Sequence, residues 1–184
     1  ITLDDDARLA DDQATSKIVQ EFQSSESLGI LSFRIENHYT GEVDPQKIPT
    51  TDKSKSPYDS FECAYFLGGG NAIHSDVFDS IGYYPPNFEY SFEELDFSYR
   101  AIDAGFRIRY LPSVCVIHEA QPKSGGVDKA VLEQYLTNRV RVAIRNLPLR
   151  YVIISSILWC GHILLRSNLD PRPLTRAITS IWSD

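Results

Sequence analysis

The chain has 184 residues, enough for one domain with a sizeable core, and 42% of them are hydrophobic and 11% aromatic. This composition excludes an intrinsically disordered protein. The three cysteines are Cys63, Cys115 and Cys160. Because they are odd in number and far apart, they argue against a disulfide framework or a cysteine-based zinc site, and they favour a reducing compartment.

Charge is distributed unevenly along the chain. Residues 136–184 contain seven arginines and two aspartates, a net charge of +5, so the first 135 residues carry −12 of the total of −7. An acidic body repels the phosphates of nucleic acids unless a metal intervenes, which argues against a nucleic acid partner. A basic and apolar C-terminal part instead favours a membrane surface.

The chain begins with an apolar strand, Ile1–Leu3, that runs into Asp4, Asp5 and Asp6. In an extended backbone Asp4 and Asp6 point to one side, and two carboxylates at the carboxyl end of a strand suit Mg²⁺ or Mn²⁺. The alternative is an acidic turn that caps the next helix. The strand has no lead-in, signal peptide or initiating methionine, so we expect the chain to be a fragment of something longer.

The next segments predict a helix, a strand and a loop. Ala10–Ser24 is expected to be helical, because its apolar residues form a stripe, and Leu28–Ile35 is expected to be a strand. The stripe consists of Ile18, Val19 and Phe22. Residues 37–58 are polar and contain prolines and lysines, which is typical of a long surface loop.

A short buried strand is predicted at Cys63–Leu67, and the glycine run Gly68-Gly69-Gly70 follows it. Three glycines permit either a sharp turn or the close approach of the backbone to a ligand. The run lacks the lysine and the spacing of the phosphate-binding and dinucleotide-binding motifs. A short helix is then expected at Ser75–Ile81, capped by Ser75 and ended by Gly82.

A further helix is predicted to begin at Ser91, where Ser91 and Glu94 have the spacing of a capping box, and to end at Gly105. The apolar residues expected to face a core are Leu95, Tyr99 and Ile102. Glu93 and Glu94 therefore fall in the first turn. Acids at this position can simply complement the helix dipole, so their chemical role depends on the rest of the chain.

Two strands separated by Pro112 are predicted next, at Phe106–Tyr110 and Val114–Ile117, and His118 stands at the carboxyl end of the second. A lone histidine is usually structural. The carboxyl ends of strands in open α/β sheets are nevertheless where ligands bind, so His118 is also a candidate ligand.

The C-terminal part is predicted to be helical. An amphipathic helix is marked by Leu132, Tyr135, Leu136 and Ala143. The run Tyr151–Leu165 carries no formal charge, but a membrane-spanning helix needs about 20 residues. The run suits an interfacial or re-entrant helix or a helix docked into the core, and the flanking Arg150 and Arg166, with Trp159, favour the membrane surface.

Four motifs therefore follow one another along the chain: Asp4–Asp6 after a strand, Gly68–Ala72, Phe92–Asp96 with Arg100, and Val116–His118. This order resembles the family 2 glycosyltransferases, which are inverting enzymes with the GT-A fold. The resemblance extends from the N-terminus to about residue 148.

The resemblance implies an α/β fold of the GT-A-like nucleotide-diphospho-sugar transferase type, N-terminally truncated, with a C-terminal helical apolar tail. Residues 1–148 would form a partial catalytic domain that contains the metal, acceptor and base elements. Residues 149–184 would form the basic, apolar helical tail.

The resemblance also implies roles for individual residues. Asp6 and His118 would bind Mg²⁺ or Mn²⁺, and Asp4 and Asp5 would contact the nucleotide-sugar donor. The residues expected on the acceptor side are Gly69, Gly70 and Asn71. His74 stands where many relatives carry arginine, which weakens a phosphate-binding role at that position.

The resemblance assigns the chemistry to the acidic pair. Glu94 would be the general base that takes the proton of the acceptor hydroxyl, and Glu93 would orient the acceptor. The family commonly has aspartate in the place of Glu94, and glutamate reaches one methylene further. Asp96 and Arg100, which lie four residues apart and can form a pair, would be structural.

The implied function is inverting transfer of a sugar from a nucleotide-diphospho-sugar to an acceptor hydroxyl, on a saccharide or a lipid-linked acceptor of the cell envelope. The implied place is the cytoplasm, at the inner face of the cell membrane. The family holds the nucleotide base with strands that precede the triple aspartate, so we expect these 184 residues alone to bind donor poorly and to turn over little or nothing.

Two alternatives stay open. A metal-dependent nucleotidyl- or phosphotransferase on the same fold would use the aspartates but would not need Glu94. A non-catalytic, membrane-associated scaffold would keep the fold without the reaction.

Overall fold

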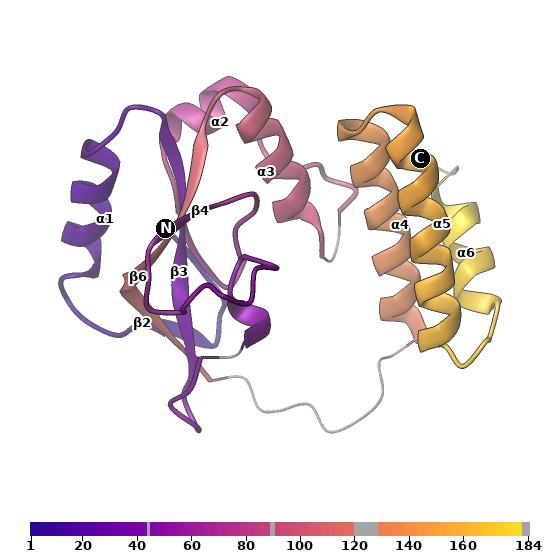
Figure 1. The fold of residues 1–184 in the computed structure, drawn as a ribbon, viewed down its shortest axis with the longest axis horizontal. Helices are drawn as coiled ribbons and strands as arrows, with labels where there is room; N and C mark the ends of the chain where they lie inside the picture. Colours follow the sequence, from indigo (N-terminus) through magenta and orange to yellow (C-terminus); the bar gives the residue numbers. More distant parts are fainter. Residues whose placement is uncertain (44, 89–90, 120–128, 182–184) are drawn as a thin grey trace. The chain divides into compact units, whose positions relative to one another are not determined.

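The computed structural model describes residues 1–43, 45–88, 91–119 and 129–181 (Figure 1). The chain divides into two compact units. The first unit comprises Ile1–Tyr83 and Phe97–Pro122, and the second comprises Tyr84–Asp96 and Lys123–Asp184. Helix α3 (Glu93–Asp103) contributes its first residues to the second unit and its remainder to the first.

The first unit is built on a six-stranded mixed sheet with the strand order β1-β5-β3-β6-β2, in which β4 also pairs with β6. Its strands are β1 (Thr2–Leu3), β2 (Ala7–Leu9), β3 (Leu28–Asn37), β4 (Phe61–Cys63), β5 (Gly70–Ile73) and β6 (Arg107–His118). Its other elements are α1 (Ala14–Gln23), the 3₁₀ helix η1 (Pro45–Lys47), α2 (Ser75–Ile81) and the later part of α3. Helix α1 lies on one side of the sheet and α3 on the other (Figure 1).

The parallel pair of β3 and β6 forms the centre of this sheet. Phe33 lies opposite Leu111, but the next residue of β3, Arg34, lies opposite Cys115. Residues 112–114 are therefore extra on the β6 side. We predicted two strands separated by Pro112; the structure instead has one strand with an irregularity, because the bulge removes proline from the hydrogen-bonding ladder without ending the pairing.

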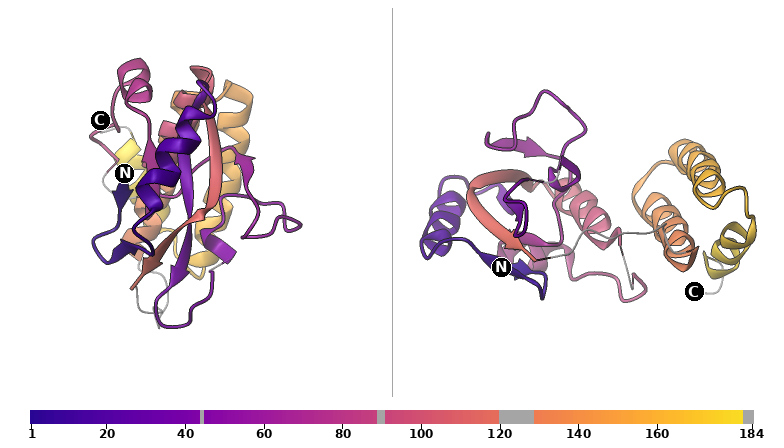
Figure 2. Two further views of the ribbon diagram at one scale, coloured as in Figure 1. Left: turned by 90° about the vertical axis from the view of Figure 1, so that its left-hand side faces the viewer. Right: turned by 90° about the horizontal axis from the view of Figure 1, so that it is seen from below.

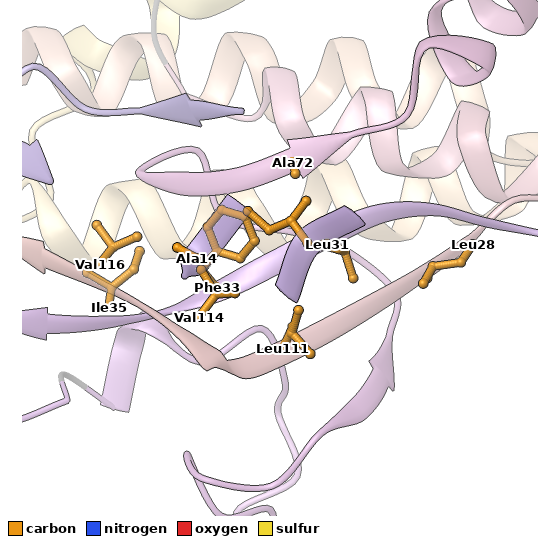
Figure 3. Close-up of a cluster of buried hydrophobic side chains, with 10 residues drawn as sticks. Ala14, Leu28, Leu31, Phe33, Ile35, Ala72, Leu111, Val114 and Val116 are labelled. Carbon is orange, nitrogen blue, oxygen red and sulfur yellow. The ribbon is translucent and has the colours of Figure 1, made fainter. Parts of the chain in front are cut away.

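The core between α1 and the sheet is apolar (Figure 3). Its buried side chains from the helix are Ala14 and Ile18, and those from the central strands include Leu31, Phe33, Val114 and Val116. The predicted helical stripe is confirmed in part: Ile18 is buried and Phe22 packs against the core, but Val19 is 48% exposed. The helix begins at Ala14, later than the predicted Ala10.

Helix α3 buries a different stripe from the one we predicted. Phe97 and Ala101 are fully buried, and the Phe97 ring contacts the rings of Phe66 and Phe78. Ile102, which was expected in the core, is 43% exposed. The prediction was wrong because two sets of residues have helical spacing: Leu95, Tyr99 and Ile102 form one face of the helix, and Phe97 and Ala101 form another. Tertiary contacts decide which of the two faces is covered.

Local boundaries also differ from the predictions. The predicted strand Cys63–Leu67 lies earlier, at Phe61–Cys63. The bounds of α2 are confirmed, and Gly82 follows it with a positive φ, but its cap is His74, whose side chain accepts a hydrogen bond from the Asp76 amide. The predicted loop at 37–58 contains, in its described part, η1 and an isolated bridge between Glu36 and Val43.

The second unit is a group of three helices, α4 (Lys129–Asn146), α5 (Leu149–Arg166) and α6 (Arg172–Ile181) (Figure 2). They pack around a small apolar core of Leu132, Leu136, Ile163 and Ala177. The predicted division after residue 148 followed composition and stays a prediction. The compact units do not follow it, because α4 packs against both α5 and α6.

Helix α5 is mostly exposed in its unit. It has 18 residues with a mean hydropathy of 1.3, and 6% of it is buried. Among the described residues it is the one helix whose length and composition would allow it to cross a membrane. The core helix of a soluble protein can have the same length and composition, but such a helix is mostly buried.

A buried carboxylate joins α3 to α4 within the second unit. Asp96 is fully buried, and its Oδ1 accepts hydrogen bonds from Arg145 Nε at 2.9 Å and from Asn146 Nδ2 at 2.8 Å. Arg100 donates to the carbonyl oxygens of Ile81 and Tyr83 in the first unit. These contacts give both residues structural roles.

We predict that Asp96→Ala lowers the free energy of unfolding by about 2–3 kcal/mol, since hydrogen bonds to a charged group are lost but the half-exposed Arg145 can turn to water. Urea denaturation followed by circular dichroism measures the change. The control is Asp11→Ala, because Asp11 pairs with Lys17 at the surface and its loss should matter much less. Equal effects of the two variants would contradict the prediction.

We also predict that the folded chain protects its thiols. Burial raises the pKa of the Cys63 thiol to about 12 and shifts the pKa values of Cys115 and Cys160 upward. Since the thiolate is the nucleophile, the native chain at pH 8 should react with DTNB roughly tenfold or more slowly than the urea-unfolded chain. Because the folded thiols hold their protons more tightly, stability should fall as the pH rises past about 8.5, where unfolded thiols ionise. A fast-reacting thiol in the native chain would contradict this.

Candidate functional site

Asp4, Asp5 and Asp6 form the connection between β1 and β2, which stand at the two ends of the strand order. Four residue steps from Leu3 to Ala7 can span at most about 14 Å. Four strand spacings in a flat sheet would require about 19 Å. The sheet is therefore curled at this end, and the curl brings its two edges together around the aspartates.

His118 is the last residue of β6 and is held on both sides. It lies opposite Asn37 of β3 and opposite Ala7 of β2, and its carbonyl oxygen accepts a hydrogen bond from the His38 amide. The next amide, that of Glu119, donates to the carbonyl oxygen of Asp6. This pairing fixes the His118 side chain, which is 14% exposed, beside the aspartate connection.

Three of the predicted site residues converge in the first unit. His118 Nε2 lies 3.3 Å from Asp4 Oδ2 and 3.1 Å from Asp6 Oδ1, and the three ligand atoms lie within 4.8 Å of one another. Asp5 is exposed and lies outside this group. The aspartates occupy a turn, closed by the Ala7 amide on the Asp4 carbonyl, rather than the extended strand that we assumed. The turn nevertheless brings Asp4 and Asp6 to one side.

The arrangement fits a divalent cation. Two carboxylates and one imidazole supply three ligand atoms, and the aspartate side chains are 43% and 45% exposed, so further positions are open to water or to a ligand. Carboxylate oxygens suit both Mg²⁺ and Mn²⁺, whereas an imidazole nitrogen is the softer ligand and favours Mn²⁺ of the two.

The glycine run lies against this cluster. A Cβ atom on Gly69 would stand 2.6 Å from Asp4 Oδ2, and one on Gly70 would stand 3.0 Å from a methyl group of Val116. A side chain at position 69 would therefore push the Asp4 carboxylate away from its place beside His118. Asn71 is 1% exposed and donates through Nδ2 to the carbonyl oxygens of Leu67 and Gly68, which braces the turn.

Glu93 and Glu94 are the first two residues of α3 and belong to the second unit. The predicted capping box is wrong, because the helix begins at Glu93 and both Ser91 and Phe92 have left-handed backbones, with φ of 69° and 70°. One oxygen of Glu93, Oε2, is buried and finds no hydrogen-bond partner among the described residues. A buried, unpaired carboxylate oxygen is costly in a structural role, and it is consistent with a site that receives a ligand donor.

Contacts from α4 and α5 hold the unusual backbone before the acidic pair. Asn138, which is 3% exposed, donates through Nδ2 to the Ser91 carbonyl oxygen at 2.9 Å. The Phe92 ring packs edge-on against the rings of Tyr135 and Trp159. Left-handed non-glycine residues cost of order 1–3 kcal/mol each, so these contacts offset strain stored next to the acids.

Sequence reasoning missed Asn138 and the closeness of Gly69 to Asp4. It did not single out Asn138, and it placed Gly69 only on the acceptor side. The available signal for Asn138 was an uncharged polar residue beside the buried positions Leu136 and Thr137. Nothing in the sequence indicates its partner, because Ser91 lies 47 residues earlier.

Comparisons with known proteins show a likeness to solved structures. No protein-family model matches the chain, and no curated protein sequence matches it. Among solved structures, the chain is similar to the crystal structure of GalNAc-T7 with UDP, GalNAc and Mn²⁺, with a TM-score of 0.53 and 17% sequence identity. The match covers 75% of this chain but 30% of that one, so the chain spans less than a third of the length of this structure. The likeness concerns the fold: the chain has a mixed α/β, GT-A-like fold.

Proposed function

We propose that the chain is the metal- and acceptor-binding part of an inverting glycosyltransferase of the family 2 type, which moves a sugar from a nucleotide-diphospho-sugar to an acceptor hydroxyl. The observation that carries this proposal is the convergence of Asp4, Asp6 and His118 from the two edges and the centre of the sheet. The GalNAc-T7 structure contains UDP, GalNAc and Mn²⁺, which supports a nucleotide sugar and a divalent metal for this chain as well.

Asp4, Asp6 and His118 would hold Mg²⁺ or Mn²⁺. When bound, the metal would supply positive charge that neutralises a diphosphate leaving group. Asp5, exposed beside the cluster, would contact the donor, as would Asp4 through its second oxygen. The bare backbone at Gly69 would keep a ligand able to approach Asp4, and Gly70 and Asn71 would continue this acceptor wall.

Glu94 would act as the general base, taking the proton of the acceptor hydroxyl as that oxygen attacks the anomeric carbon. Attack from the face opposite the leaving group inverts the configuration at that carbon. Glu93 would accept a hydrogen bond from the acceptor through Oε2, and its unpaired state in the described structure supports this role. The N-terminal end of α3 stabilises negative charge on both carboxylates.

The proposed place of action is the inner face of the cell membrane, with a saccharide or lipid-linked acceptor. Support comes from α5, whose apolar side chains are largely exposed in its unit, with Ile157 and Leu158 each 66% exposed. The charge difference between the two parts of the chain favours the same surface, and Arg150 and Arg166 lie at the two ends of this helix.

We predict that the chain binds Mn²⁺ in calorimetry and that Asp6→Ala and His118→Ala each weaken binding at least about tenfold, the loss that even outer partners of metal ligands produce. The matched control uses His74 and Asp76, which also make a histidine–aspartate contact at 3.3 Å but have no third ligand among the described residues. His74→Asn, which keeps a capping side chain, and Asp76→Ala should leave the affinity unchanged.

The affinity for Mn²⁺ should also fall as the pH is lowered, since protons compete with the metal for the imidazole and carboxylates. Absence of Mn²⁺ binding, or binding that ignores Asp6→Ala and His118→Ala, would favour the non-catalytic scaffold.

The assignment of the base is tested by Glu94→Gln in a chain that carries this segment together with a donor pocket. Release of nucleoside diphosphate from a panel of UDP- and GDP-sugars measures turnover. We expect kcat to fall by about 10²–10⁴-fold, the usual contribution of a general base, while the affinity for Mn²⁺ stays the same. Asp103→Asn, at the exposed end of the same helix, is the control. Unchanged turnover in Glu94→Gln would rule out this base and favour a nucleotidyl- or phosphotransferase.

A further inference from the structure

The second unit contains an apolar pocket with a single cationic group. It has a volume of about 420 Å³ and lies between the later part of α4 and the first half of α5. We call it the Arg139 pocket; its lining includes Arg139, Leu147, Tyr151, Ile154, Leu158 and Trp159. Its volume falls in the range of pockets that bind small molecules, about 300–1,000 Å³.

Arg139 is unusual within this pocket. Its guanidinium carbon lies 5.5 Å from the centre of the Trp159 ring and 5.7 Å from that of Phe92, so aromatic faces surround the charge. Its Nε atom is buried and finds no acceptor among the described residues. An unsatisfied donor on a charged group costs free energy in an apolar site, and an anionic acceptor would remove this cost. The guanidinium fork matches the geometry of phosphate.

The shape of the pocket indicates what accompanies the anion. Tyr151, Ile154 and Leu158 follow one another at helical spacing, so the apolar wall extends about 10 Å along α5. This wall suits one hydrocarbon chain. The exposed apolar residues of α5 and the arginines that flank it favour a lipid over a soluble anion, because the same helix carries the surface that fits a membrane.

We propose that the Arg139 pocket binds a single phosphate-bearing lipid, with the phosphate on the Arg139 guanidinium and the first part of the hydrocarbon chain along α5. The inference extends the proposed membrane association, but its test measures neither sugar transfer nor adsorption to vesicles. It can therefore fail while the proposed function stands, and the reverse also holds. Arg139 also packs against the ring of Phe92, which is the residue before Glu93.

The test uses the fluorescence of Trp159. The chain contains two tryptophans, and Trp182→Phe leaves Trp159 as the reporter within the pocket. The probes are decyl phosphate below its micelle concentration, 1-decanol and inorganic phosphate. We expect decyl phosphate to change the Trp159 fluorescence in a saturable way. Binding of 1-decanol or of inorganic phosphate should be weaker by about tenfold or more, because 1-decanol supplies only the hydrocarbon chain and phosphate supplies only the charge.

Arg139→Gln should weaken the binding of decyl phosphate about tenfold or more. The matched control is Arg150→Gln, because Arg150 also stacks on an aromatic ring, that of Tyr151 at 4.8 Å, but stands outside the pocket lining. Leu158→Asp is a second variant; the residue is 66% exposed, so the change should preserve folding while it blocks the hydrocarbon wall. Circular dichroism confirms that each variant is folded.

The proposal would be overturned if Arg139→Gln or Leu158→Asp had the same affinity for decyl phosphate as the parent chain. If the chain bound 1-decanol as tightly as decyl phosphate, the pocket would be only an apolar groove. If it bound inorganic phosphate as tightly as decyl phosphate, the pocket would be only a site for soluble anions. Either result contradicts a lipid-phosphate site. Loss of binding in both variants, with Arg150→Gln unchanged, supports it.

Discussion

The short connection between β1 and β2 is the constraint on which the candidate metal site depends. Three aspartates must join strands that stand at opposite ends of the strand order, and they can do so only where the sheet curls. The curl carries the Asp4 and Asp6 carboxylates to the end of β6, where pairing with β2 and β3 holds His118. The Gly69 backbone lies close to Asp4, so that a Cβ atom there would stand 2.6 Å from Asp4 Oδ2. Strand pairing thus brings the candidate metal ligands Asp4, Asp6 and His118 together, even without attraction between their side chains.

The acidic pair depends on a different kind of support. Hydrogen bonds from Arg145 and Asn146 fasten the buried Asp96 of α3 to α4, and Asn138 and aromatic packing hold the left-handed residues before Glu93. This support is costly to build, because it includes a buried charge and two strained residues. Such cost is typical of segments whose position matters more than their stability. Helices α4 and α5 therefore hold the start of α3 and supply the Arg139 pocket.

Much of this organisation was predictable from local patterns. The helical spacing of Ile18 and Phe22, the glycine stops after α2 and α3, and the alternating residues of β6 indicated the elements, since propensity and periodicity are local properties. The triple aspartate and His118 were recognisable as candidates because both follow apolar strands, whose carboxyl ends gather ligands in α/β sheets. Errors arose where two local patterns competed, as on the faces of α3, or where proline was absorbed into a bulge.

The sequence by itself determined which residue types were available: carboxylates after a strand, glycines without side chains, paired acids in a first turn and a basic, apolar C-terminal region. Only the tertiary structure decided that Asp4 and Asp6, but not Asp5, meet His118 and that Asn138 holds Ser91. It also decided that the Nε of Arg139 finds no acceptor in the part of the chain that the structure describes. These outcomes depend on strand order, register and helix packing. They join residues tens of positions apart, and local periodicity carries no information about such pairings.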